Sequence, residues 1–384
     1  MSRINLFVMK KSIIVFIFCI LFFNVYSQQK IEGNLGNFHV NKIYLFEVVN
    51  EYREIYRVID STEVSKGNFM FVLNNVTPEL YFMSDNFEHG GYFFLDEENV
   101  MLTIESVTEK EITWNVKGSR LNKLYREFAD ELYVATNRHI RDSLDRRFFQ
   151  AREAGDKVEM ERIKQEAMPY YVGERDIERA LVDRYLEKNR NNPFGAYLYY
   201  SKIFQFKNFP TMNEIDKERA YIGAFGEKAK NNRYISWMEE QLMTYENCSI
   251  GHEAPEIIGK DTLGNPIRLS DFRGNYVLVD FWHSYCHWCR KETAVLKKAL
   301  RYFEGKNFKI LGVSSDFHED RWKKIIREDG CFWDHMILER GNPASRLYCV
   351  KGVPYIVLIG PDGKILAKEL RGQDLIDVPD QFVK

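Results

Sequence analysis

The feature that most constrains this chain is a Cys-x-x-Cys pair between an apolar run and a helical segment. The run from Val277 to Trp282 is apolar except for Asp280, which predicts a buried strand, and residues 290–302 have helical spacing. Cys286 and Cys289 lie between them, on the expected first turn of the helix. Cysteines so placed are close enough to form a disulfide, and the free amides and dipole of the helix end stabilise a thiolate on Cys286. The spacing therefore predicts thiol and disulfide chemistry.

The first 27 residues have the parts of a secretory signal. A basic start is followed by an apolar core over residues 13–23, and Ser27 stands at the expected cleavage position. An uncleaved membrane anchor is the alternative, while the bulky Phe18 disfavours lipid attachment at Cys19. We therefore expect an exported protein of the periplasm or cell envelope, with or without a membrane tether.

Export would place the remaining cysteines in an oxidising compartment, where a Cys-x-x-Cys pair more often cycles between dithiol and disulfide than holds a metal. These cysteines are Cys248, Cys286, Cys289, Cys331 and Cys349. Because five is odd, at least one thiol must be free, transient or paired with another chain. We expect Cys331 and Cys349 to be a second disulfide or inert buried thiols, with exchange between Cys349 and the active site as another possibility.

The length of 384 residues predicts several domains. After the signal at 1–27, strand-like runs over 42–48, 68–73, 92–95 and 101–104 are separated by turns, which predicts a small antiparallel β domain over residues 28–117. Residues 118–247 have helical periodicity without sustained heptads, and Pro193 marks a helix start. This region is expected to be a helical spacer between the other two domains.

Residues 248–384 alternate between strands and helices, which predicts an α/β domain. Strands are expected at 308–313 and 355–359, with a helix over 319–328. The turn at 360–364 leads into a further short strand, as in a hairpin.

Three separated motifs of this domain resemble the thioredoxin superfamily. They are the strand Val279-Asp280-Phe281-Trp282, the pair Cys286-x-x-Cys289 and the triplet Gly352-Val353-Pro354. The leader over residues 251–274 and Glu292 are most similar to exported TlpA-like thiol:disulfide oxidoreductases, whose domains are of the thioredoxin-like, AhpC/TSA type and which include the reductases of cytochrome c maturation. Residues 60–71 resemble a β-rich module of unknown function that often precedes such domains. The resemblance implies a thioredoxin-like fold for the last third of the chain.

The resemblance also assigns roles to the reactive residues. It makes Cys286 the attacking thiolate and Cys289 the thiol that resolves the mixed disulfide. It gives Asp280 the role of a buried acid that moves a proton to or from the resolving cysteine, and burial alone should raise the proton affinity of this carboxylate. Glu292 matches an acid near the cysteine pair of the cytochrome-maturation reductases, although a solvated helix face explains it equally well. Since both acids are present, which one serves Cys289 stays open.

Five further residues are candidates for substrate binding. The resemblance implies a cis bond before Pro354, which would place the Val353 backbone opposite Cys286, free to pair with an extended substrate. Trp282 is expected beside the cysteines or simply in the core. The dipeptide His287-Trp288 departs from the Pro-containing pairs common in the family: a protonated His287 would make the disulfide more oxidising, and Trp288 would shield the site. The direction of electron flow is therefore open.

We expect a protein-thiol:disulfide oxidoreductase, with reduction favoured, that exchanges disulfides with protein substrates and needs no bound cofactor or metal. A membrane or periplasmic thiol protein would donate electrons, because no nicotinamide or flavin fingerprint is present. The balance of 54 Lys and Arg against 56 Asp and Glu gives no reason to expect a nucleic-acid partner. The oligomeric state is not indicated.

Other functions and sites fit parts of the sequence. A peroxiredoxin-type peroxidase, with antioxidant activity, would share the fold, but His283 stands where such enzymes use Thr or Ser. An envelope binding or scaffold protein with a secondary thioredoxin domain is the alternative from another class. A zinc site completed by Cys331 and His335 is disfavoured by the strand-to-helix position of the cysteine pair. Haem attachment would need His where Arg290 stands.

Overall fold

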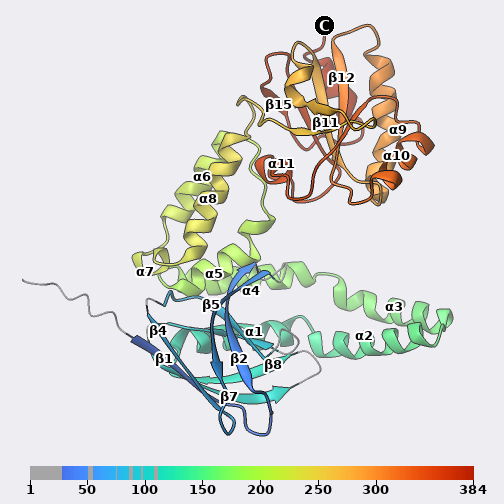
Figure 1. The fold of residues 1–384 in the computed structure, drawn as a ribbon. Helices are drawn as coiled ribbons and strands as arrows, with labels where there is room; N and C mark the ends of the chain where they lie inside the picture. Colours follow the sequence, from blue (N-terminus) through green and yellow to red (C-terminus); the bar gives the residue numbers. More distant parts are fainter. Residues whose placement is uncertain (1–27, 51–54, 75, 86–89, 97, 108–110) are drawn as a thin grey trace, which may run out of the picture.

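The computed structural model describes residues 28–384 except 51–54, 75, 86–89, 97 and 108–110. The predicted signal at residues 1–27 lies outside these. Figure 1 shows strands at the bottom, helices in the middle and an α/β domain at the top, so the predicted fold class is confirmed. Within the described ranges, no helix has the length and apolar character needed to cross a membrane.

The N-terminal region consists of two four-stranded sheets, with strand orders β4-β1-β7-β8 and β3-β2-β5-β6. The strands are β1 (Gln28–Asn34), β2 (Lys42–Asn50), β3 (Ile55–Glu63), β4 (Asn68–Asn74), β5 (Leu80–Ser84), β6 (Gly90–Phe94), β7 (Val100–Val107) and β8 (Ile112–Lys117). Alternate residues of β1 are buried, which is typical of a strand with one face on a core. Side chains of both sheets, among them Leu45, Phe71 and Trp114, form that core.

One pairing in this region departs from the predicted antiparallel arrangement. Strands β1 and β7 run parallel, with Ile31 opposite Val100, whereas the other pairings in the two sheets are antiparallel. A parallel pair needs a long crossover connection, which the intervening strands supply. The expectation of a purely antiparallel domain was therefore wrong at this position.

The helical region follows directly. It contains α1 (Arg120–Ala135), α2 (Arg138–Glu153), α3 (Lys157–Tyr171), α4 (Glu174–Asn189), α5 (Pro193–Lys202), a short 3-10 helix (Phe204–Phe206), α6 (Met212–Gly223), α7 (Glu227–Lys230) and α8 (Arg233–Asn247). Helices α2 and α3 project to one side in Figure 1 and pack against each other around a small core of their own. As predicted, Pro193 is the first residue of its helix, and the Asn192 side chain caps that helix by accepting the Gly195 amide hydrogen bond at 3.2 Å.

A buried ionic cluster joins the strands to the helices. The Glu79 carboxylate lies just before β5 and is fully buried, and it accepts a 2.7 Å hydrogen bond from the Arg233 main-chain N–H at the start of α8. The Arg233 guanidinium forms ion pairs with Glu79 and with Glu47 of β2. Burial raises the pKa of Glu79 to about 7, although the Arg233 N–H bond opposes it, and burial lowers the pKa of Arg233 to about 10. The start of α8 is thereby held on the sheet.

The C-terminal domain is built on a seven-stranded sheet of order β10-β9-β13-β12-β11-β14-β15. Its elements are β9 (Ile258–Lys260), β10 (Pro266–Arg268), a 3-10 helix (Leu269–Phe272), β11 (Tyr276–Trp282), α9 (His287–Tyr302), β12 (Phe308–Ser314), α10 (Glu319–Glu328), β13 (Asp334–Ile337), α11 (Ala344–Leu347), β14 (Tyr355–Ile359), β15 (Ile365–Ala367) and α12 (Asp374–Asp380). Strand β11 runs parallel to β12 and antiparallel to β14.

Strand β11 is buried on both faces. Val277, Val279 and Phe281 belong to a core that continues through α5 and α8 of the helical region. Leu278 points to the opposite face, where it packs with Leu296 and other residues of α9. Helix α8 of the helical region contacts this domain at α11, and α9 covers the face of the sheet on which Leu278 lies.

Candidate active site

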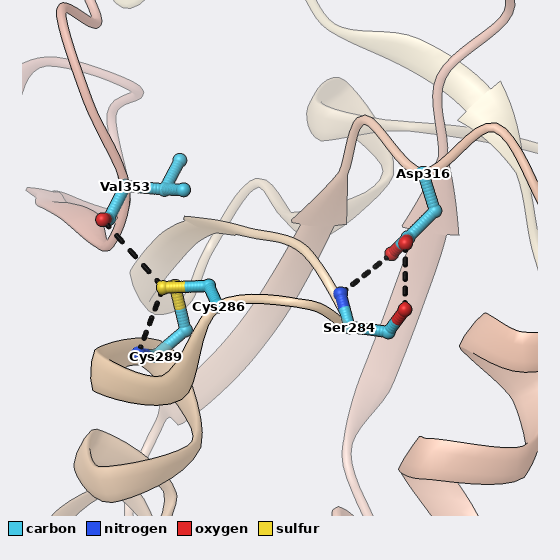
Figure 2. Close-up of a disulfide and its surroundings, with 5 residues drawn as sticks. All are labelled: Ser284, Cys286, Cys289, Asp316 and Val353. Atoms are coloured by element: carbon cyan, nitrogen blue, oxygen red, sulfur yellow. Dashed lines mark hydrogen bonds between the residues drawn. A yellow bond between two sulfur atoms is a disulfide. The ribbon is translucent and has the colours of Figure 1, made fainter. Parts of the chain in front are cut away.

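The Cys-x-x-Cys pair lies at the junction between β11 and α9. The helix begins at His287, so Cys286 is its N-cap, and the Cys286 Sγ accepts a 3.0 Å hydrogen bond from the Cys289 N–H. A disulfide joins Cys286 to Cys289, with their Cα atoms 5.2 Å apart (Figure 2). The same amide would donate to a Cys286 thiolate once the disulfide is opened, at the end of the helix that favours negative charge.

The two sulfur-bearing residues differ in access to solvent. Cys286 is 9% exposed and Cys289 is 3% exposed, so an incoming thiol or disulfide meets Cys286 first. The Val353 carbonyl oxygen lies 3.6 Å from the Cys286 Sγ (Figure 2). The bond from Val353 to the buried Pro354 is cis, as the resemblance implied. The Val353 backbone therefore faces the sulfur that is more accessible.

The loop before Cys286 is held by a carboxylate from the neighbouring strand. Asp316, just beyond β12, accepts hydrogen bonds from the Ser284 N–H at 2.9 Å and from the Ser284 hydroxyl at 2.7 Å (Figure 2). The Ser314 hydroxyl donates a third bond to Asp316 at 2.6 Å. All three residues are buried. This network fixes the position of the chain two residues before the N-cap.

Asp280 occupies the middle of β11 and is 5% exposed. It alternates with Val279 and Phe281, so its side chain shares the α9 face of the sheet with Leu278 and Trp282. Its Oδ1 atom is buried and accepts no hydrogen bond from any residue that the structure describes. Burial raises the Asp280 pKa to about 7, opposed by the positive charge of Arg371 and supported by the negative charge of Glu292. The group is therefore suited to exchanging a proton near neutral pH.

Glu292 lies one turn into α9 and is half-buried. Its carboxylate accepts a 3.1 Å hydrogen bond from the Gly372 N–H, next to Arg371. Its charge acts on Asp280, as noted above, so the two acids belong to one electrostatic group. The hydrogen bond to Gly372 gives Glu292 a structural partner.

Trp282 packs in a cluster with both active-site cysteines, Trp322 and Cys331. Its ring lies 5.8 Å from the ring of His335, which is buried. Burial lowers the His335 pKa to about 4, and its Nε2 lies 3.1 Å from the Cys331 carbonyl oxygen. In the described ranges, no group of three or more His, Cys, Asp or Glu side chains is placed to hold a metal ion.

The two residues between the cysteines point outward. His287 is exposed, and Trp288 is 66% exposed, with the Lys291 ammonium 4.4 Å from its ring centre. Trp288 lines one side of a hollow of about 590 Å³ whose other residues are Lys291, Glu292, Val295, Val353, Pro354, Arg371 and Gly372. The hollow lies between the first turns of α9 and the loop that carries the cis bond. An extended chain lying there would pass close to Cys286.

Comparisons with known proteins match two parts of this chain. Residues 250–368 match the AhpC/TSA family, and residues 29–125 match a domain of unknown function (DUF4369). The thiol-disulfide oxidoreductase ResA of Bacillus thuringiensis is 26% identical over 139 residues, which are 36% of this chain and 79% of that protein. ResA of Bacillus subtilis is 27% identical over 121 residues, covering 32% of this chain and 67% of the relative.

The family match and the ResA relatives decide the class of the domain. The C-terminal part of the chain is a thioredoxin-like domain of the thiol-disulfide oxidoreductase type. Among solved structures, the thioredoxin domain of a thiol-disulfide oxidoreductase from Bacteroides vulgatus is 47% identical to this chain; the match covers 35% of this chain and 99% of that one, with a TM-score of 0.35.

Some contacts of the thioredoxin-like domain were not predicted. The Ser284 and Asp316 pair was missed, although a polar residue just past the carboxyl end of β12 is a usable signal, since β11 ends at the same edge of the sheet. Of the two alternatives expected for Cys331 and Cys349, the structure has buried free thiols and no disulfide between them. Cys349 lies against Cys248, with the Sγ atoms 3.8 Å apart, whereas the Cys331 Sγ lies 4.0 Å from the Thr293 hydroxyl.

Proposed function

We propose that this protein is an exported thiol:disulfide oxidoreductase that reduces disulfides of other proteins through Cys286 and Cys289. The observation that carries the proposal is the disulfide at the start of α9, whose more exposed sulfur accepts an amide hydrogen bond from the helix end. The proposed export depends on the signal pattern of residues 1–27.

The proposed reaction starts from the reduced protein. The Cys286 thiolate attacks one sulfur of a substrate disulfide, forming a mixed disulfide and releasing the other substrate sulfur as a thiolate, which takes up a proton. Cys289 then loses its proton and attacks the Cys286 Sγ, which closes the Cys286 to Cys289 disulfide and releases the second substrate thiol. The substrate gains two electrons and two protons, and another thiol protein restores the dithiol. No bound cofactor takes part.

Asp280 is the proposed acceptor of the Cys289 proton. It lies on the face of β11 that α9 covers, and its pKa near 7 allows it to take up and release a proton in the working range. Transfer across any gap would need a water molecule. Glu292 is proposed to act through the charge it places near Asp280, since its carboxylate is occupied by the Gly372 N–H.

The proposed substrate is an extended protein segment. Its backbone would pair with Val353, and its side chains would meet Pro354, Trp288 and the hollow beside them. Trp282 is only 6% exposed, so it would pack against the cysteines and would not contact the substrate. His287, which is exposed, would lie at the edge of the bound segment.

Reduction of insulin by dithiothreitol tests the activity. Wild-type protein should accelerate it, and Cys286→Ser should reduce the rate to that of the uncatalysed reaction. Cys331→Ser is the matched control, because this buried thiol takes no part in the proposed cycle. Equal rates for wild type and Cys286→Ser would remove the proposal.

Trapping identifies the attacking sulfur and the physiological substrates. Cys289→Ser cannot resolve the mixed disulfide, so it should accumulate in covalent complexes through Cys286. Complexes that persist in the Cys286→Ser protein, with Cys289 intact, would reverse the assigned roles.

A further inference from the structure

A second cysteine pair lies at the junction of the helical region and the thioredoxin-like domain. Cys248 is the C-cap of α8, and Cys349 lies two residues beyond α11. Although they are 101 positions apart in sequence, their Sγ atoms are 3.8 Å apart, and no disulfide joins them. Cys248 is fully buried and Cys349 is 9% exposed. The two thiols thus need only a small movement to reach bonding distance.

A buried ammonium group lies beside this pair. The Lys368 Nζ is 3.2 Å from the Cys248 Sγ and 2.9 Å from the Cys248 carbonyl oxygen, and Lys368 is 8% exposed. A buried ammonium is costly unless an anion neutralises it. Across the described part of the chain, Lys368 forms no ion pair with a carboxylate, so the Cys248 thiolate is the anion within reach.

The Cys248 and Cys349 thiols differ in how readily they ionise. The hydrogen bond between the two sulfur atoms, together with the positive charge of Lys368, lowers the pKa of Cys248 against the effect of burial. The same hydrogen bond and burial raise the pKa of Cys349 above its usual range. One thiolate beside one thiol is the arrangement required for an attacking and a resolving cysteine.

We propose that Cys248 and Cys349 are a second redox-active pair, which closes to a disulfide between α8 and the segment leading to Val353. A small peroxide is the class of oxidant suited to so buried a site. The Cys248 thiolate attacks one oxygen of hydrogen peroxide, giving a sulfenic acid and hydroxide. The Cys349 sulfur then attacks the Cys248 sulfur; the S–S bond forms, and the sulfenic oxygen leaves as water with the Cys349 proton. Each sulfur is oxidised by one electron, and the peroxide is reduced to one hydroxide ion and one water molecule.

Formation of the Cys248 to Cys349 disulfide would affect the active site through the short segment from Cys349 to Val353. Cys349 has a left-handed backbone with φ of 56°, and it precedes by four residues Val353, whose carbonyl oxygen lies 3.6 Å from the Cys286 Sγ. A bond to Cys248 would anchor the start of this segment to the helical region. Oxidation of this pair by peroxide would therefore constrain the loop that carries Val353 and faces the substrate.

Thiol mapping of the full chain tests the proposal. The protein carrying Cys286→Ser and Cys289→Ser is reduced, treated with hydrogen peroxide, denatured and alkylated, and its peptides are analysed by mass spectrometry. We expect a cross-linked peptide joining Cys248 to Cys349, so that alkylatable thiols among Cys248, Cys331 and Cys349 fall from three to one. Adding Cys331→Ser, the matched control, should leave the cross-link unchanged.

Two variants test the assigned roles. With Cys349→Ser, the sulfenic acid on Cys248 should persist and react with dimedone. With Lys368→Met, cross-linking at neutral pH should slow about tenfold or more, because less Cys248 is ionised.

Full alkylation of both thiols after peroxide treatment, or over-oxidation of Cys248 without a cross-link, would overturn the proposal. The same mapping on wild-type protein gives a second measurement if the double variant does not fold. Since the active-site cysteines are absent from the test protein, its outcome is independent of the function proposed above.

Discussion

Replacing Asp280 with Asn should change how the stability of the protein depends on pH. Burial raises the pKa of this carboxyl from 3.8 to about 7, and such a shift corresponds to about 4 kcal/mol. The folded state binds this proton more tightly than the unfolded state, so raising the pH from 3.8 to about 7 removes stability from the wild-type protein. The Asn amide has no charge to bury. The unfolding free energy of Asp280→Asn, relative to that of wild type, should therefore be about 3 kcal/mol higher at about pH 8 than at about pH 5.

Urea unfolding of the oxidised protein at these two pH values, followed by tryptophan fluorescence, measures the change. Any pH-independent effect of the amide cancels between the two conditions. Asp130→Asn, at an exposed position of α1, is the control and should alter the unfolding free energy by less than about 0.5 kcal/mol at either pH. Equal free-energy differences between Asp280→Asn and wild type at both pH values would refute the reasoning.

Three further substitutions have expected outcomes that urea unfolding or kinetics can measure. Asp316→Ala should lower the unfolding free energy by about 2 to 4 kcal/mol, because the buried N–H and hydroxyl of Ser284 lose their acceptor; an unchanged unfolding midpoint would contradict this. Arg233→Met should cost about 3 to 5 kcal/mol at pH 8 by leaving Glu79 buried without its counter-charge, and less at pH 5, where Glu79 is protonated; an equal cost at both values would be inconsistent with the raised pKa. Trp288→Ala should leave stability within about 0.5 kcal/mol of wild type but raise the KM for insulin several-fold, since this exposed ring lines the proposed substrate hollow; an unaltered KM would remove it from substrate binding.

Local pattern was sufficient to predict much of the C-terminal fold. The strand Tyr355–Ile359 and the helix Glu319–Glu328 have the predicted bounds, because an uninterrupted apolar run and a regular helical spacing are each bordered by turn residues. The helix after the cysteines starts three residues earlier than its apolar spacing indicated, at His287, because Cys286 caps it. The parallel pairing of β1 with β7 lies beyond such patterns, since nothing in either strand identifies its partner.

Part of the candidate site could likewise be predicted from the sequence, and part of it could not. Its reactive cysteines, the buried Asp280 and the Val353 to Pro354 bond all lie within short motifs that sequence comparison can match. The contact between Ser284 and Asp316 requires β11 and β12 to end side by side. The approach of Cys248 to Cys349 requires α8 to pack on the thioredoxin-like domain. Both contacts depend on tertiary packing between distant segments, which residue spacing does not encode.

Titration of the Cys286 thiol tests the central claim most directly. In the reduced Cys289→Ser protein, the rate of iodoacetamide alkylation at Cys286, followed by peptide mapping across pH, gives the pKa of this thiol. Ionisation well below the ordinary value of about 8.5, so that most of the thiol is thiolate at neutral pH, is the result we expect from its place at the start of α9. A pKa at or above about 8.5 would contradict the proposal that the helix end activates this sulfur for disulfide exchange.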